Sequence, residues 1–181
     1  MKCETCQKKG EIIVEYTQIS FCKKCYERLL FRRLKRWFRN NCVIDKKKTH
    51  VLLDDGSLGF LFLKTFFKKF FSFPGLKWET RKRVNSRMKN KIIMLPTTLT
   101  QESDRFIHAI MNDGQYSSRI VEEKESLKIF KQLTIFLDSD LKKWKRRRIT
   151  PELRSVNSFI EEIVKRRPMT RFSIVKHLQE F

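Results

Sequence analysis

The sequence is poor in acidic residues, in glycine and in proline. Of its 181 residues, 20 are Asp or Glu and 41 are Lys or Arg, so the formal net charge is +21. This excess is far larger than solubility requires, and it favours a polyanionic partner, with nucleic acid preferred over a membrane surface. Five glycines and four prolines exclude a collagen-like or linker-dominated chain. Hydrophobic residues make up 40% of the chain, which excludes wholesale disorder because a core can form.

The sequence also has no long hydrophobic run and no visible signal peptide. Met1 is followed by polar residues instead of an apolar segment. The most apolar stretch, 58–76, is interrupted by Lys64, Lys68 and Lys69. Its uninterrupted part is too short for a bilayer, which needs about 20 residues. We therefore expect an intracellular, cytoplasmic protein without a membrane partner.

Cysteine is absent after residue 42, and the first four cysteines form the pattern C-x2-C-x15-C-x2-C: Cys3, Cys6, Cys22 and Cys25. Two such pairs on tight turns can converge on one tetrahedral Zn²⁺ ion. Two disulfides fit poorly with a chain that lacks a secretory signal. An iron–sulfur cluster also takes four thiolates, although the paired spacing is more typical of zinc. We expect the zinc to be structural, because four protein ligands leave no open position on the metal. We expect the fifth cysteine, Cys42, to be a small buried hydrophobic residue.

Hydrophobic periodicity predicts strands that alternate with helices. The expected strands are 11–16, 51–53, 92–95 and part of 127–136. The expected helices are 23–40, the segment after 58, 77–91, 100–111, a helix through 144, 151–165 and 170–181. Residues 115–126 are expected to form a loop. This alternation is typical of an α/β fold with a small parallel sheet. We expect a zinc ribbon with a basic helix over 1–42 and an α/β domain over 43–181.

The first predicted helix carries one row of basic residues beside an apolar face. Between residues 23 and 39 there are eight Lys or Arg and one acid, Glu27. With so few acids for pairing within the helix, we interpret this row as a phosphate-facing surface instead of a merely solvated one. The candidate contacts there are Arg28, Arg32, Lys35, Arg36 and Arg39, and two further basic runs add Arg81, Lys82, Arg83, Lys145, Arg146, Arg147 and Arg148.

The segment D-D-G-S-L-G lies between a predicted strand and a predicted helix, where helix N–H groups can bind phosphate. Together with the four-cysteine ribbon and the basic aromatic helix, this order of elements resembles the tRNA 2-thiolation family of PP-loop ATP pyrophosphatases. The resemblance implies an adenine nucleotide alpha hydrolase-like fold. It extends loosely over the chain through 81–93, 95–100, 106–111, 131–133 and 158–176.

The chain departs from this family at the loop that holds ATP, where active members carry Ser-Gly-Gly-x-Asp-Ser. The resemblance places there Asp54, Asp55, Gly56, Ser57, Leu58 and Gly59. Two acids would repel phosphate, Leu58 replaces the functional Asp, and Gly59 replaces the last Ser. Active members also use later cysteines, which this chain lacks. We therefore expect a degenerate PP-loop, no catalytic residue and no bound ATP.

These departures resemble the cytoplasmic tRNA 2-thiolation protein 2 family, the degenerate partner of a catalytic PP-loop paralogue. The resemblance implies a non-catalytic, tRNA-binding subunit of a heterodimer that thiolates wobble uridine, with sulfur from a thiocarboxylated ubiquitin-like carrier. Two alternatives stay open. One is an autonomous thiouridylase with a divergent nucleotide site, and the other is an unrelated zinc-ribbon protein that binds nucleic acid.

Overall fold

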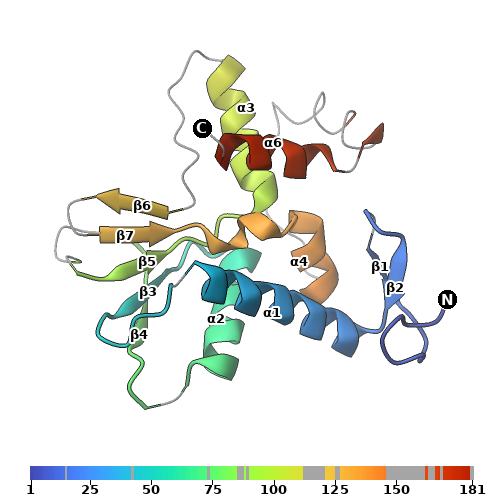
Figure 1. The fold of residues 1–181 in the computed structure, drawn as a ribbon, viewed down its shortest axis with the longest axis horizontal. Helices are drawn as coiled ribbons and strands as arrows, with labels where there is room; N and C mark the ends of the chain where they lie inside the picture. The colour runs from blue at the N-terminus through green and yellow to red at the C-terminus, as the bar shows by residue number, and fades with distance from the viewer. Residues whose placement is uncertain are drawn as a thin grey trace.

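The N-terminal part of the chain is a two-stranded ribbon followed by a long helix. The computed structural model describes residues 1–14, 16–41, 43–72, 74–84, 88, 90–111, 121–124, 127–145, 162, 166–167 and 169–179. Strands β1 (Ile12–Val14) and β2 (Ile19–Phe21) pair antiparallel, and helix α1 (Lys23–Asn40) starts two residues after β2. The predicted first strand and first helix are thus confirmed. Figure 1 shows the ribbon and the main sheet at opposite ends of α1.

The main sheet has five strands in the order β4-β3-β5-β7-β6. They are β3 (His50–Leu53), β4 (Trp78–Arg81), β5 (Ile92–Met94), β6 (Val121–Lys124) and β7 (Leu127–Phe130). Strands β4, β3, β5 and β7 run parallel, whereas β6 pairs antiparallel with β7 at one edge. The described helices that connect or follow them are α2 (Leu58–Phe70), α3 (Leu99–Met111), η2 (Gln132–Ile135), α4 (Asp138–Lys145) and α6 (Thr170–Gln179). The predicted α/β fold with a small parallel sheet is confirmed.

Two segments differ from the expectations. The segment 77–91, expected to be helical, contains the edge strand β4, which pairs with β3 along its whole length. The expected loop 115–126 contains β6. Both are edge strands rich in charged residues, so neither has the apolar alternation by which a strand is found from sequence. Pairing with a neighbouring strand, which local periodicity does not encode, decides their structure. The expected helix 151–165 lies outside the described residues, except for Glu162.

The core forms where the apolar face of α1 meets the phenylalanine stripe of α2. Phe38 of α1 stacks on Phe66 of α2 with ring centroids 5.5 Å apart, and Phe31 stacks on Phe62 at 5.3 Å. Full burial of each such ring contributes roughly 1.5–3 kcal/mol. The same cluster extends into the ribbon through Phe21 and into the sheet. The stripe therefore belongs to the hydrophobic core.

Buried polar contacts attach the later helices to this core. The Tyr26 hydroxyl of α1 donates to Asp140 Oδ1 of α4 at 3.0 Å, and burial raises the pKa of the Asp140 carboxyl. Arg171 of α6 donates to Ser103 Oγ of α3 at 2.7 Å and also pairs with Asp104. Within the ranges that the structure describes, none of the helices combines the length and the hydrophobicity that a membrane crossing needs.

Candidate functional sites

The four cysteines of the ribbon converge on one point. Their Sγ atoms all lie within 4.8 Å of one another, and those of Cys6 and Cys22 are 3.6 Å apart. A tetrahedral ion with metal–sulfur bonds of about 2.3 Å places its ligand sulfurs about 3.8 Å apart. In a four-iron cluster each thiolate binds a different iron, so the sulfurs lie farther apart than around one ion. The cysteines can therefore hold a metal, and their spacing suits a single ion.

The ionisation of one thiol in this cluster opposes the ionisation of the others. Burial acts to raise the pKa of Cys3, but hydrogen bonds with the backbone of Cys22, Cys6 and Thr5 outweigh it and lower this pKa to about 6. The pKa of Cys25 rises instead to about 12, because its thiol form is favoured by a hydrogen bond with Cys22 and by burial. Four sulfurs at this spacing repel one another when ionised, so full deprotonation requires a cation among them.

The segment 54–59, which we call the strand-end turn, runs from the end of β3 into the first turn of α2. Asp54 Oδ1 accepts a hydrogen bond from Gly56 N at 3.1 Å, and Asp55 Oδ1 accepts one from Ser57 N at 2.9 Å. Ser57 Oγ caps α2 by accepting from Phe60 N at 3.1 Å. These backbone N–H groups are the ones that would bind a phosphate at this position. Because side chains of the turn occupy these three N–H groups, and two of those side chains are carboxylates, an anion bound here would have to displace them.

Close packing also fills the space beside this turn. In an open α/β sheet, ligands bind outside the carboxyl ends of the strands where the strand order reverses, and here this point lies between β3 and β5. Gly59, in the first turn of α2, is buried there against the segment that leaves β5. A Cβ atom on Gly59 would lie 2.4 Å from the carbonyl oxygen of Pro96 and 3.1 Å from Leu133 Cδ1. No side chain fits at position 59 unless these segments move apart.

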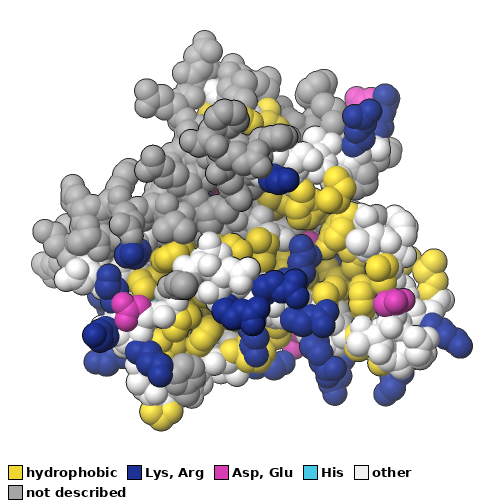
Figure 2. Space-filling view, in the orientation of Figure 1, with side chains coloured by type: hydrophobic (Ala, Val, Ile, Leu, Met, Phe, Trp, Pro, Cys, Tyr) yellow, Lys and Arg dark blue, Asp and Glu magenta, His cyan; other side chains and the backbone are white. Residues whose placement is uncertain are grey.

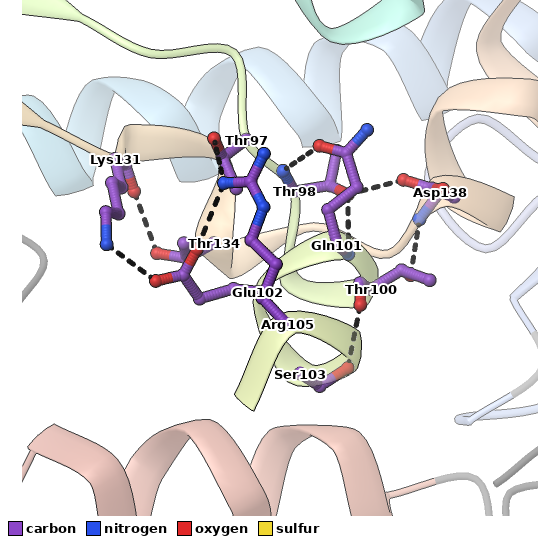
Figure 3. Close-up of polar contacts among 10 residues, drawn as sticks. All are labelled: Thr97, Thr98, Thr100, Gln101, Glu102, Ser103, Arg105, Lys131, Thr134 and Asp138. Atoms are coloured by element: carbon purple, nitrogen blue, oxygen red, sulfur yellow. Dashed lines mark hydrogen bonds and ion pairs between the residues drawn. The ribbon is translucent and has the colours of Figure 1, made fainter. Parts of the chain in front are cut away.

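The ends of β5 and β7 are joined by a polar cluster, drawn in Figure 3. Thr98 caps α3, because its side-chain Oγ1 accepts from Gln101 N at 3.4 Å while its backbone N donates to Gln101 Oε1 at 3.1 Å. Lys131, which follows β7, places its Nζ 2.7 Å from Oε1 of Glu102 on α3. The side chains of Lys131 and Glu102 are 10% and 2% exposed. A buried ion pair thus occupies the strand ends, and sequence reasoning missed it because its partners are 29 residues apart.

The exposed side of α1 carries the predicted basic row. Arg28, Arg32, Lys35, Arg36 and Arg39 are all exposed, and Figure 2 shows Lys and Arg side chains gathered over α1. In the part of the chain that the structure describes, the first four of these have no carboxylate within 4 Å.

The helix's acid and its remaining arginine face other elements. Glu27 is held by Lys69 of α2 at 3.1 Å and by the Trp144 indole of α4 at 3.2 Å. Arg33 donates to the Tyr16 hydroxyl at 2.6 Å and to the Ile135 carbonyl at 3.1 Å, so it is an anchor instead of a surface cation. The positive charge of the row is therefore left facing solvent.

The other predicted basic residues lie on different elements. Arg81, Lys82 and Arg83 are exposed at the end of the edge strand β4, where Arg81 also pairs with Glu79 at 2.9 Å. Lys145 is exposed at the end of α4, next to Trp144, whose contact with Glu27 brings this end to α1. Arg146, Arg147 and Arg148 lie outside the described residues. Lys69 of α2, which no sequence pattern singled out, joins this surface through its contact with α1.

Comparison with known proteins identifies a structural relative. No protein-family model matches the chain, and neither does any curated protein sequence. Among solved structures, the U34-tRNA thiolase NcsA from Methanococcus maripaludis, with its [4Fe-4S] cluster, is similar with a TM-score of 0.70. The similarity covers 98% of this chain and 86% of that chain, at 12% sequence identity. At this identity the similarity shows the fold, so the chain has the α/β fold of a tRNA thiolase.

Proposed function

We propose that this chain is a non-catalytic, tRNA-binding subunit that acts with a catalytic partner in the 2-thiolation of wobble uridine in cytosolic tRNAs. The strand-end turn is the observation that carries the proposal. In a fold shared with a U34-tRNA thiolase, the backbone N–H groups of Gly56 and Ser57 are bonded to Asp54 and Asp55. The resemblance in sequence places the ATP-binding loop of active relatives at this turn.

The ATP step would then fall to the partner, a PP-loop paralogue. Replacing an oxygen of uridine by sulfur requires that the oxygen first become a good leaving group, which adenylation supplies. A chain that has no phosphate cradle at the strand-end turn is poorly equipped to bind ATP for this step. The partner would also receive sulfur from a thiocarboxylated ubiquitin-like carrier, because in this proposal the four cysteines of the ribbon bind a metal and are not free for sulfur transfer.

The proposed role of this chain is to hold tRNA. Support comes from the exposed row on α1, where Arg28, Arg32, Lys35 and Arg36 have no carboxylate partner in the described ranges. Positive side chains of this kind neutralise backbone phosphates and release their counterions. Lys145 extends the surface at the end of α4, and 81–83 provide a second basic group at the sheet edge.

The metal of the ribbon is proposed to be structural zinc. Cys25 lies in the first turn of α1 and Cys22 precedes it, whereas Cys3 and Cys6 lie before β1. A tetrahedral ion bound by all four would therefore fasten the start of the basic helix to the ribbon. With four thiolates around it, the ion would have no open position for substrate.

The proposal is tested by isolating the tagged chain from the cells that produce it and identifying its bound partners by mass spectrometry. We expect a PP-loop protein with an intact Ser-Gly-Gly-x-Asp-Ser loop to copurify. Deletion of this chain should remove 2-thiouridine from wobble positions, measured on digested tRNA. Recovery of no such partner together with unchanged thiolation would refute the proposal.

Two measurements on the isolated chain separate the alternatives. Release of pyrophosphate from ATP in the presence of tRNA, lost on substitution of Gly56 and Ser57, would identify an autonomous thiouridylase. Competition of tRNA against duplex DNA and ribosomal RNA fragments tests the third possibility. A preference for either competitor would indicate a nucleic-acid-binding protein unrelated to thiolation.

A further inference from the structure

The ring of Phe70 lies where α2 packs against α1, in contact with Lys35 of the basic row. Phe70 is the last residue of α2 and is half-buried. Its ring packs edge-on against Phe31 of α1, with centroids 5.5 Å apart, and lies 5.1 Å from the ring of Phe66. The Nζ atom of Lys35 is 3.6 Å from the Phe70 centroid, and that of Lys69 is 5.8 Å away. The core supports the ring, and an exposed ammonium group lies over its face.

Lys35 makes a cation–π contact with this ring instead of an ion pair with a carboxylate. In the described ranges it has no carboxylate within 4 Å, and its ammonium group rests on the ring's negative face. It is on the same exposed row as Arg28 and Arg32, at helical spacing. A phosphate is a stronger partner for an ammonium group than an aromatic ring, because the contact is a charge-assisted hydrogen bond. A polyanion bound along α1 would therefore draw Lys35 away from Phe70.

We propose that Phe70 is a stacking platform for an unpaired RNA base, uncovered when a phosphate of RNA bound along α1 takes up Lys35. Every nucleobase has a π face and stacks on an aromatic side chain, whereas bases inside a duplex are already stacked. The partner therefore carries a loop, a bulge or a single-stranded end next to its phosphate contacts. This inference rests on the proposed function and specifies how the same surface distinguishes tRNA from continuous duplex.

The experiment measures binding of the metal-loaded full chain to tRNA and to a blunt RNA duplex over a series of salt concentrations. Phe70→Leu should weaken tRNA binding roughly tenfold while the dependence on salt stays unchanged, because loss of stacking releases no counterion. Its duplex binding should equal that of the unmodified chain. Lys35→Ala should lower the salt slope by about one, since one phosphate contact is lost.

Phe71→Leu is the matched control, because Phe71 is the adjacent half-buried phenylalanine and packs on Phe38 and Phe67. It should bind tRNA as the unmodified chain does, and Phe70→Tyr, which keeps a ring, should also retain binding. Unchanged tRNA binding by Phe70→Leu, or an equal loss with Phe71→Leu, would overturn the inference. An unmodified chain that binds no tRNA would overturn the proposed function and the inference together.

A second measurement needs no variant at Phe70. Irradiation of the unmodified chain with tRNA that carries 5-iodouridine at unpaired positions links a stacked base to its aromatic partner. We expect the crosslinked peptide to contain Phe70. Crosslinks confined to other peptides would overturn the stacking inference while leaving tRNA binding intact.

Discussion

Replacement of Lys131 by Met tests the buried ion pair that occupies the strand ends. Lys131 Nζ lies 2.7 Å from Glu102 Oε1, and the two side chains are 10% and 2% exposed. Removal of one partner of a buried pair leaves an uncompensated charge and costs about 3–5 kcal/mol. Arg105 Nη1, 3.9 Å from the other carboxylate oxygen, compensates part of this charge. We therefore expect a loss near the lower limit, about 3 kcal/mol.

A second pair of the same length but different burial provides the control. Lys91 Nζ lies 2.7 Å from Glu79 Oε1, with side chains 28% and 29% exposed. Arg81 also pairs with Glu79, at 2.9 Å, so this carboxylate keeps a cation when Lys91 is removed. Lys91→Met should therefore cost less than about 1 kcal/mol, as exposed pairs do. The two variants remove the same chemical group at the same distance and differ in solvent exposure.

The measurement is urea and thermal unfolding of the metal-loaded chain followed by circular dichroism. For a chain of this size, about 3 kcal/mol lowers Tm by roughly 6–12 °C. The double variant Lys131→Met with Glu102→Gln should recover part of the loss, because no charge then remains buried. If Lys131→Met costs no more than Lys91→Met, the reasoning from burial is refuted.

Two further predictions concern Gly59 and His50. Gly59→Ala should cost about 2–3 kcal/mol in urea unfolding, because its Cβ would lie 2.4 Å from a backbone carbonyl oxygen. Gly75→Ala is the control: its Cβ would meet no atom within 4 Å, so it should cost only the strain of its positive φ, about 1 kcal/mol. Equal losses would contradict the close packing at Gly59. Burial lowers the pKa of His50 below its ordinary 6.5. As pH falls, His50 therefore becomes protonated in the unfolded chain at a higher pH than in the folded chain. The free energy of unfolding should fall as pH drops from 6.5 toward the lowered pKa. His50→Gln should flatten the dependence of Tm on pH in this window, and an unchanged slope would show that other groups cause it.

Local patterns in the sequence predicted the features that depend on near neighbours. The two cysteine pairs converge as their spacing implies, with Cys3 and Cys6 before β1 and Cys22 and Cys25 at the start of α1. The apolar and basic faces of α1 follow from a period of 3.6 residues, which needs no tertiary information. The phenylalanines of α2 share one face for the same reason. Strands β4 and β6 were missed because their partners, and not their own residues, define them.

Residue identity and spacing alone supplied the chemical groups of the sites: four thiols that can hold a metal, a basic helical row, and two acids at the end of β3. The two acids act locally, because each accepts a hydrogen bond from a backbone N–H group two residues ahead, at Gly56 and Ser57. Tertiary packing placed Gly59 against Pro96, joined Lys131 to Glu102, and set Lys35 over Phe70. Each of these contacts joins residues far apart in the chain. Their distances depend on how helices and strands pack, which no local pattern specifies.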